Sequence, residues 1–147
     1  MKKMCYILLP VLVLFLGCGD DKSNTPSINQ IIGADEPITL APGAFKEFAV
    51  NVDLNAHDNA IIRGEFSVRD GEKITVLVMS SDAFTTWRAN GSATTIFSSG
   101  QISNGEVDET IDESGNYYVV FSNKSDSAKE KRVFSSIALF TDVGDEF

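Results

Sequence analysis

Short runs of alternating apolar and polar residues recur along the chain, and this periodicity restricts the fold more than any other feature of the sequence. Residues 48–54 and 62–68 alternate, whereas residues 74–79 are apolar on both parities. Alternation indicates a strand with one buried face, and apolar residues on both parities indicate a strand that is covered on both faces. Further candidate strands cover residues 94–98, 106–111, 117–122 and 132–141. The pattern predicts an all-β protein, an antiparallel β-sandwich or jelly roll of about seven or eight strands.

One segment departs from this periodicity and predicts a short helix. Ser81 or Asp82 can cap its start, and Gly91 suits the left-handed residue that ends a helix. Phe84 and Trp87 lie three residues apart, so they share one face. A helix of about two turns is stable only when it packs against something else. We therefore expect Phe84 and Trp87 to dock this helix on the sandwich.

The first residues have the layout of a secretory signal peptide. Lys2 and Lys3 precede an apolar stretch over residues 5–16, and the small residue Gly17 precedes Cys18. A helix needs about 20 apolar residues to cross the hydrocarbon core of a bilayer, and this stretch has about 12. We therefore expect export and removal of the signal peptide rather than a permanent membrane span.

The residues Phe15-Leu16-Gly17-Cys18 resemble the lipobox of bacterial lipoproteins. The resemblance implies cleavage before Cys18 and a covalent lipid on that residue, which anchors the protein in the bacterial cell envelope, at the outer membrane or on a periplasmic face. Gly17 and Cys18 match the pattern, whereas Phe15 and Leu16 stand where the family prefers Leu and a small residue. The alternative is an ordinary cleaved signal peptide that leaves a free cysteine.

Composition divides the chain into a signal peptide and three further parts. Residues 18–36 are rich in Asp, Ser, Asn, Pro and Gly, which predicts a flexible tether. The strand runs predict one domain over residues 37–142, followed by an acidic tail over residues 143–147. Cys5 leaves with the signal peptide, over residues 1–17, so the mature chain cannot form an internal disulfide. The same cleavage removes two lysines and takes the net charge from −9 to −11.

A second resemblance covers residues 37–142. It depends on the order of a strand-turn-strand unit beginning at Phe66, the segment with Phe84 and Trp87, and the run Glu113-Ser-Gly-Asn-Tyr-Tyr-Val-Val-Phe-Ser-Asn123. These features together resemble the GOLD-type β-sandwich, which is known from the p24 family of eukaryotic secretory cargo proteins and from related bacterial extracytoplasmic domains. Bacterial pre-peptidase C-terminal domains share the Gly-x-Tyr-Tyr feature. The resemblance implies a non-catalytic domain for protein or ligand interaction.

Two acidic segments are candidate cation sites. Asp53, Asn55 and Asp58 place oxygen ligands in a turn, but the segment lacks the Gly and the bidentate Glu of the helix-loop-helix calcium motif. Glu106 and Asp108 belong to a carboxylate-rich strand, which is typical of a solvated sheet edge that resists pairing. We expect a polar turn and an acidic edge strand, with a calcium site as the alternative and no other cofactor.

Trp87, Arg88 and Tyr118 are the candidate surface for a ligand or a partner, because aromatic residues favour recognition. Core packing of Trp87 is the alternative. The only histidine, His57, has no Gly-x-Ser-x-Gly motif and no zinc-ligand pattern to act with, so we expect no enzyme activity. The acidic net charge argues against binding to nucleic acid.

The expected function is a lipid-anchored module that binds another envelope protein or an extracellular ligand. A carbohydrate-binding or calcium-dependent adhesion module is the alternative. That alternative expects Trp87, Tyr118 or Phe97 to be exposed beside polar groups.

Overall fold

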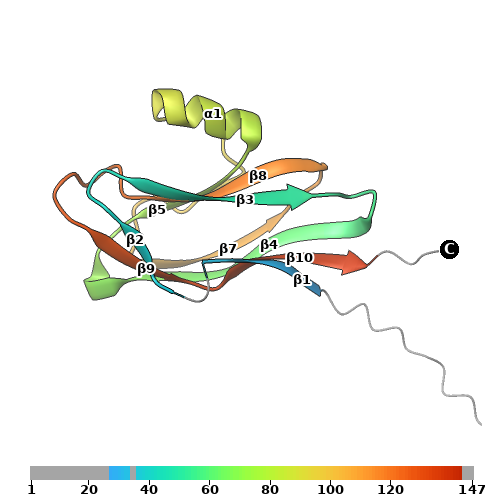
Figure 1. Cartoon of the computed structure of the whole chain (residues 1–147), viewed down its shortest axis with the longest axis horizontal. Coiled ribbons are helices and arrows are strands. Elements are labelled where there is room, and N and C mark those ends of the chain that lie inside the picture. Colours follow the sequence, from blue (N-terminus) through green and yellow to red (C-terminus); the bar gives the residue numbers. More distant parts are fainter. Residues whose placement is uncertain (1–26, 34–35, 144–147) are drawn as a thin grey trace, which may run out of the picture.

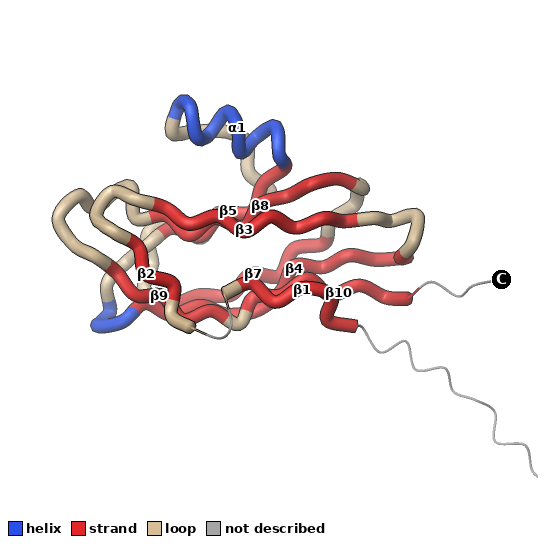
Figure 2. The backbone as a smooth tube through the Cα atoms, in the orientation of Figure 1, coloured by secondary structure: helices blue, strands red, loops and turns tan. Residues whose placement is uncertain are grey.

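The protein folds as two antiparallel β-sheets packed face to face, as a computed structural model of residues 27–33 and 36–143 describes (Figure 1). One short helix lies outside the sandwich (Figure 2). The predicted all-β sandwich is therefore confirmed. No helix in this described part of the chain is long and apolar enough to cross a membrane. The expected signal peptide (1–17), Cys18 and residues 144–147 lie outside the described residues.

The larger sheet is built around β4 (His57–Val68), its longest strand. Along one side of β4 lie β10 (Ile137–Val143) and β9 (Lys131–Ser135), one after the other. Along the other side lies β7 (Asn104–Thr110), which among the described strands pairs with β4 alone. The far edge is closed by two short strands that pair with β10 and β9 respectively, β1 (Ser27–Ile32) and β2 (Ile38–Leu40).

The smaller sheet has the strand order β3 (Phe45–Val52), β8 (Gly115–Ser122), β5 (Thr75–Ser80) and β6 (Phe97–Ser98). The run that begins at Gly115 thus forms a central strand, β8, between β3 and β5. A single 3-10 turn, η1 (Arg69–Gly71), leads from β4 into β5 and so carries the chain from the larger sheet to the smaller one.

The core lies between the inner faces of the two sheets. Phe66 in β4 and Val119 in β8 are buried there, at positions that the alternation of their strands predicts. Tyr117 lies at the edge of this core, and its hydroxyl donates a hydrogen bond to the Glu113 carbonyl oxygen at 2.8 Å. Burial raises the pKa of the Tyr117 phenol, and the carboxylates of Glu113 and Asp112 raise it further.

The apolar character of β5 on both parities follows from its two covered faces. Val76 and Val78 pack in the core between the sheets, whereas Leu77 and Met79 pack on the outer side, in the cluster formed with α1 (Ser81–Asn90). Removing each such side chain from water contributes about 1.5–3 kcal/mol. The prediction of a strand covered on both faces is confirmed.

The N-cap of helix α1 lies one residue before the first of the two expected candidates. Ser80, rather than Ser81 or Asp82, is the cap, and its Oγ accepts a hydrogen bond from a backbone N–H of the first turn at 3.3 Å. At the other end Gly91 adopts the expected left-handed conformation, with φ 77°, and its N–H donates to the Trp87 carbonyl oxygen at 2.7 Å.

The N-terminal boundary of the domain differs from the prediction. The composition of residues 18–36 predicts a flexible tether, but Ser27–Ile32 form β1, antiparallel to β10. Ile32 is fully buried in the core, and Gln30 Nε2 donates a hydrogen bond to a backbone carbonyl of β3 at 2.8 Å. These contacts and the ladder with β10 order a segment that has few apolar residues of its own. The predicted tether therefore shortens to residues 18–26.

The described residues form ten strands, more than the sequence predicts. Alternation predicts neither β1 nor β2, and the strand expected over residues 132–141 is divided at Ser136 into β9 and β10. At this division β4 comes very close: a Cβ on Gly64 would lie 2.5 Å from the Ser136 carbonyl oxygen and 2.6 Å from Cα of Ile137. Gly64 also has φ +147°, so only glycine fits there without strain. The tail expected from residue 143 begins within β10.

Candidate functional site on the outer face of the larger sheet

No helix among residues 27–33 and 36–143 covers the outer face of the larger sheet, whereas α1 packs on the smaller sheet against β8 and β5 (Figure 2). Two large apolar side chains are exposed among the described residues, Phe134 at 47% and Ile96 at 41%. Phe134 belongs to β9, where the buried Val133 alternates with it, so its ring lies on the open outer face. An exposed aromatic ring on an uncovered sheet is a candidate contact for a partner.

Strand register arranges the side chains of this face in cross-strand rows. In each row β4 supplies the middle residue, β7 supplies one flank, and β9, β10 or the junction between them supplies the other. An aromatic ring lies in the first and the last row, and the charged side chains lie in the two middle rows. In order, the rows are Phe134–Ser67–Asn104, Ser136–Glu65–Glu106, Ala138–Arg63–Asp108 and Phe140–Ile61–Thr110.

The two middle rows carry an excess of negative charge. Arg63 Nε lies 2.9 Å from Asp108 Oδ1, an exposed ion pair. Glu65 and Glu106 are direct partners across β4 and β7, and like charges in that position destabilise a sheet. The two rows hold three carboxylates and one guanidinium, so their net charge is −2. The one guanidinium, that of Arg63, is already paired with Asp108.

Two adjoining hollows, of about 470 and 520 Å³, lie over these rows. Glu65, Glu106 and Ser136 line both of them; Phe134 lines the first and Phe140 the second. Ser67 and Ser136 contribute to this room, because their short side chains put little on the floor of the hollows. We call the surface the outer-face groove, which comprises Arg63, Gly64, Glu65, Phe66, Ser67, Asn104, Gly105, Glu106, Val107, Asp108, Phe134, Ser135, Ser136 and Phe140.

The predicted surface of Trp87, Arg88 and Tyr118 lies on the other side of the sandwich. Trp87 is only 6% exposed and packs edge to face on Phe45, with the ring centres 5.0 Å apart. Tyr118 is half-buried in the same cluster, and Arg88 is exposed. The Lys124 ammonium lies 4.1 Å from the centre of the Trp87 ring, within cation–π distance. Trp87 thus attaches α1 to the smaller sheet, as the packing alternative expects.

The candidate cation ligands belong to separate parts of the fold. Asp53 Oδ1 accepts hydrogen bonds from the backbone N–H and the side-chain Nδ2 of Asn55, at 2.9 and 3.1 Å, which is a local turn interaction. Asp58 is exposed at the start of β4, whereas Glu106 and Asp108 lie in the outer-face groove. Across residues 27–33 and 36–143, no group of three or more His, Cys, Asp or Glu side chains is arranged to hold a metal ion.

His57 is the first residue of β4. Its Nδ1 lies 3.2 Å from the Asp142 carbonyl oxygen, and the residue lines neither hollow of the outer-face groove. The fold therefore separates His57 from the carboxylates of Glu106 and Asp108.

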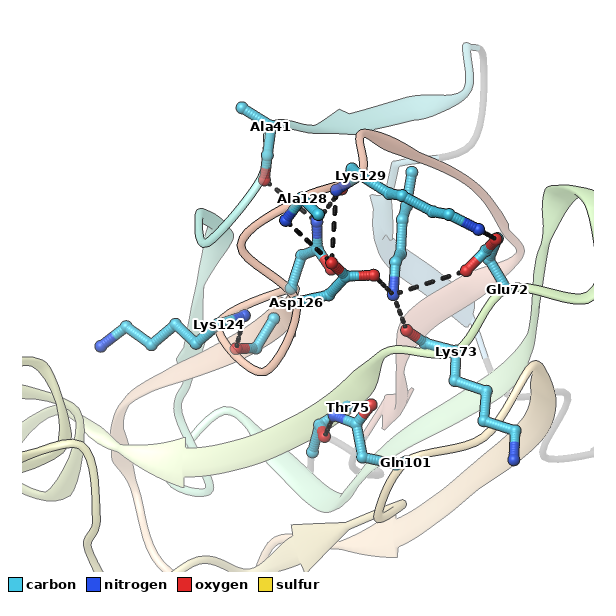
Figure 3. Close-up of polar contacts among 12 residues, drawn as sticks. Ala41, Glu72, Lys73, Thr75, Gln101, Lys124, Asp126, Ala128 and Lys129 are labelled. Atoms are coloured by element: carbon cyan, nitrogen blue, oxygen red, sulfur yellow. Dashed lines mark hydrogen bonds and ion pairs between the residues drawn. The ribbon is translucent and has the colours of Figure 1, made fainter.

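A second charged cluster joins two connections between the sheets, and Figure 3 shows Glu72 and Asp126 from these two connections. Lys131 is only 4% exposed, and its Nζ donates a hydrogen bond to the Lys73 carbonyl oxygen at 2.6 Å. The same ammonium lies 3.2 Å from Asp126 and 3.9 Å from Glu72. A backbone N–H of its own loop and the Lys131 ammonium hold the pKa of Asp126 below its ordinary value. Because these charges satisfy one another, we assign the cluster to stability rather than to binding.

The sequence analysis singled out Glu106 and Asp108 of the groove, but it missed Phe134, Phe140 and Glu65, among others. Strand parity places Phe134 and Ser136 on one face, and it places Glu65 opposite the buried face of its strand. Parity does not say which strands are neighbours, so it could not bring Phe134, Glu65 and Glu106 into one groove.

No protein-family model matches the chain, and no curated protein matches its sequence. The resemblances to the bacterial lipobox and to the GOLD-type β-sandwich stay predictions from the residues that carry them.

Proposed function

We propose that this protein is a lipid-anchored extracytoplasmic lipoprotein whose β-sandwich acts as a non-catalytic interaction module. A lipid on Cys18 attaches the chain to the membrane, and the outer-face groove binds another envelope protein or an extracellular ligand. The observation that carries the binding role is the groove itself, a hollowed and uncovered sheet face beside the exposed ring of Phe134.

The start of β1 supports a position close to the membrane. An extended chain spans at most about 3.3–3.6 Å per residue, so the predicted tether over residues 18–26 reaches at most about 32 Å. β1 begins beside the end of β10 and the start of β4, so these lie at the anchored end of the sandwich. Asp58 and Asp142 lie at this end, and an anionic lipid surface repels their charges, so the domain stays within reach of the tether without lying on the lipid.

The structure favours a protein partner over the carbohydrate or calcium alternative. That alternative needs Trp87, Tyr118 or Phe97 as an exposed stacking platform, and none of the three is among the exposed large apolar side chains of the described residues. The groove instead offers charge and apolar surface over several strands, which suits a polypeptide.

The first test is membrane attachment. We expect Cys18→Ser to move the protein from the membrane fraction to an unprocessed or soluble form, because two or three acyl chains are needed for stable anchoring. Cys5→Ser is the matched control, because that cysteine leaves with the signal peptide and its change should not alter fractionation. A cleaved Cys18→Ser variant that stayed in the membrane would contradict the anchor.

The second test is partner capture. Brief in-cell crosslinking of the tagged protein, followed by mass spectrometry, should enrich one envelope protein relative to the Cys18→Ser variant. If no protein is enriched, the interaction module as proposed is wrong, and binding assays with glycans and calcium follow.

A further inference from the structure

We propose that the outer-face groove binds an extended segment of a partner protein in which a lysine or arginine lies between two apolar side chains. This inference rests on the proposed function and names the occupant of that same site. It follows from the order of the cross-strand rows, which read aromatic, acidic, ion-paired and aromatic along β4.

The acidic row explains the cationic side chain. Glu65 and Glu106 face each other across two strands, and neither is joined to a lysine or arginine by an ion pair among the described residues. Arg63, the cation of the groove, is already held by Asp108 at 2.9 Å. A lysine or arginine from a partner that enters between Glu65 and Glu106 cancels their repulsion and gains two charge-assisted contacts.

The flanking rows explain the apolar side chains. Phe134 lies beyond the acidic row in one direction, and Phe140 with Ile61 lies beyond the ion pair in the other. From Ser67 to Ile61 the rows cover six residue steps of β4, about 20 Å at about 3.3 Å per residue. An extended segment of about seven residues has the same repeat, so its first, third and seventh side chains meet the first aromatic, the acidic and the last aromatic row.

Two other occupants fit less well. A second copy of this chain that stacked groove on groove would bring together two surfaces that each carry a net charge of −2, which repel. An oligosaccharide would not use the excess charge of −2, since neutral sugars bring no cation. The favoured occupant is therefore a cationic, partly apolar polypeptide segment.

The decisive experiment uses the full-length, detergent-solubilised protein and a defined peptide. The probe is a fluorescent heptapeptide, Phe-Ser-Lys-Ser-Asn-Ser-Leu with blocked ends, and binding is followed by fluorescence polarisation. We expect saturable binding that weakens about tenfold or more when the peptide lysine is replaced by glutamate, because the acidic row then repels the peptide. Equal binding of the two peptides overturns the proposal, as does their displacement by a neutral oligosaccharide.

Protein variants then locate the binding. We expect Glu65→Gln with Glu106→Gln to weaken the lysine peptide about tenfold, and Phe134→Ser to weaken both peptides, because one change removes charge and the other removes apolar contact. Glu36→Gln with Glu113→Gln makes the same charge change at two exposed positions outside the groove and should leave binding unchanged. If the control pair weakens binding as much as the groove pair, the effect comes from net charge and the proposed site is wrong.

In-cell crosslinking separates this inference from the proposed function. If the groove variant captures the same partner as the unchanged protein, the protein is still an interaction module, but this inference is wrong and so is the groove as the binding site in the proposed function. If neither captures a partner, the proposed function itself fails. If capture depends on Glu65 and Glu106 and the crosslinked partner segment carries the apolar-cationic-apolar pattern, both are supported.

Discussion

The outer faces of the two sheets differ in what packs on them among the described residues. On the smaller sheet, α1 returns over the surface, and Phe84 and Trp87 pack against Phe45 and Tyr118. On the larger sheet, no described helix covers the face that carries Phe134. Whether an aromatic residue is buried or exposed here therefore depends on whether another element covers it, and not on its type.

Paired alanine substitutions test this difference most strongly. Trp87→Ala removes a large buried side chain that holds α1, and we expect the free energy of unfolding to fall by about 3–5 kcal/mol. Phe134→Ala removes a half-exposed ring from the open face, and we expect a change within about 0.5 kcal/mol. Chemical denaturation of both variants measures the two effects. Equal losses would mean that the open face is packed in the folded protein.

The inner faces of the two sheets should behave alike, in contrast to the outer faces. Phe66 belongs to the larger sheet and Val119 to the smaller one, and both are buried in the same core. We expect Phe66→Ala and Val119→Ala each to lower the free energy of unfolding by about 2–4 kcal/mol, because each leaves a cavity between the sheets. Losses below about 0.5 kcal/mol for both would contradict the strand parity on which the core is assigned.

Local patterns predicted the parts of this fold that depend on neighbours in sequence. The alternation of β3 and β4 predicted two strands, and the residues from Ser81 to Gly91 predicted the helix and its end, with the cap misplaced by at least one residue. The position of β1 could not be predicted in this way, because the segment is ordered by its ladder with β10, more than a hundred residues further along the chain.

The candidate site was harder still to predict, because its residues come together only through the pairing of strands that are far apart in the sequence. Glu65 and Glu106 become partners only because β7 pairs with β4, and Phe134 joins their groove only because β9 lies on the other side of β4. The burial of Lys131 is similar, since its carboxylate partners come from two different connections between the sheets. A sequence shows that such residues are charged or aromatic, but not what the pairing places opposite them.

The pH should affect the stability contributed by the charged connections between the sheets, but not the stability contributed by the helix packed on the smaller sheet. Asp126 has a pKa below its ordinary value of 3.8, first because a backbone N–H of Ala128 donates to it and then because of the Lys131 ammonium. A carboxyl group with a lowered pKa stabilises the folded state above its unfolded pKa, and this contribution is lost as the pH falls through the folded pKa. The loss should therefore begin near pH 4 and be complete only below the folded pKa.

We expect Asp126→Asn to lower the free energy of unfolding by a constant amount between pH 7 and pH 5, and this difference from the unchanged protein to shrink as the pH falls below about 4. Trp87→Ala removes no ionisable side chain, so the loss that it causes should stay the same over that range. Denaturation curves of both variants at several pH values give the comparison. A pH-independent effect of Asp126→Asn would mean that the residue acts through the shape of its loop, whereas the expected convergence at low pH assigns its effect to the charge that faces Lys131.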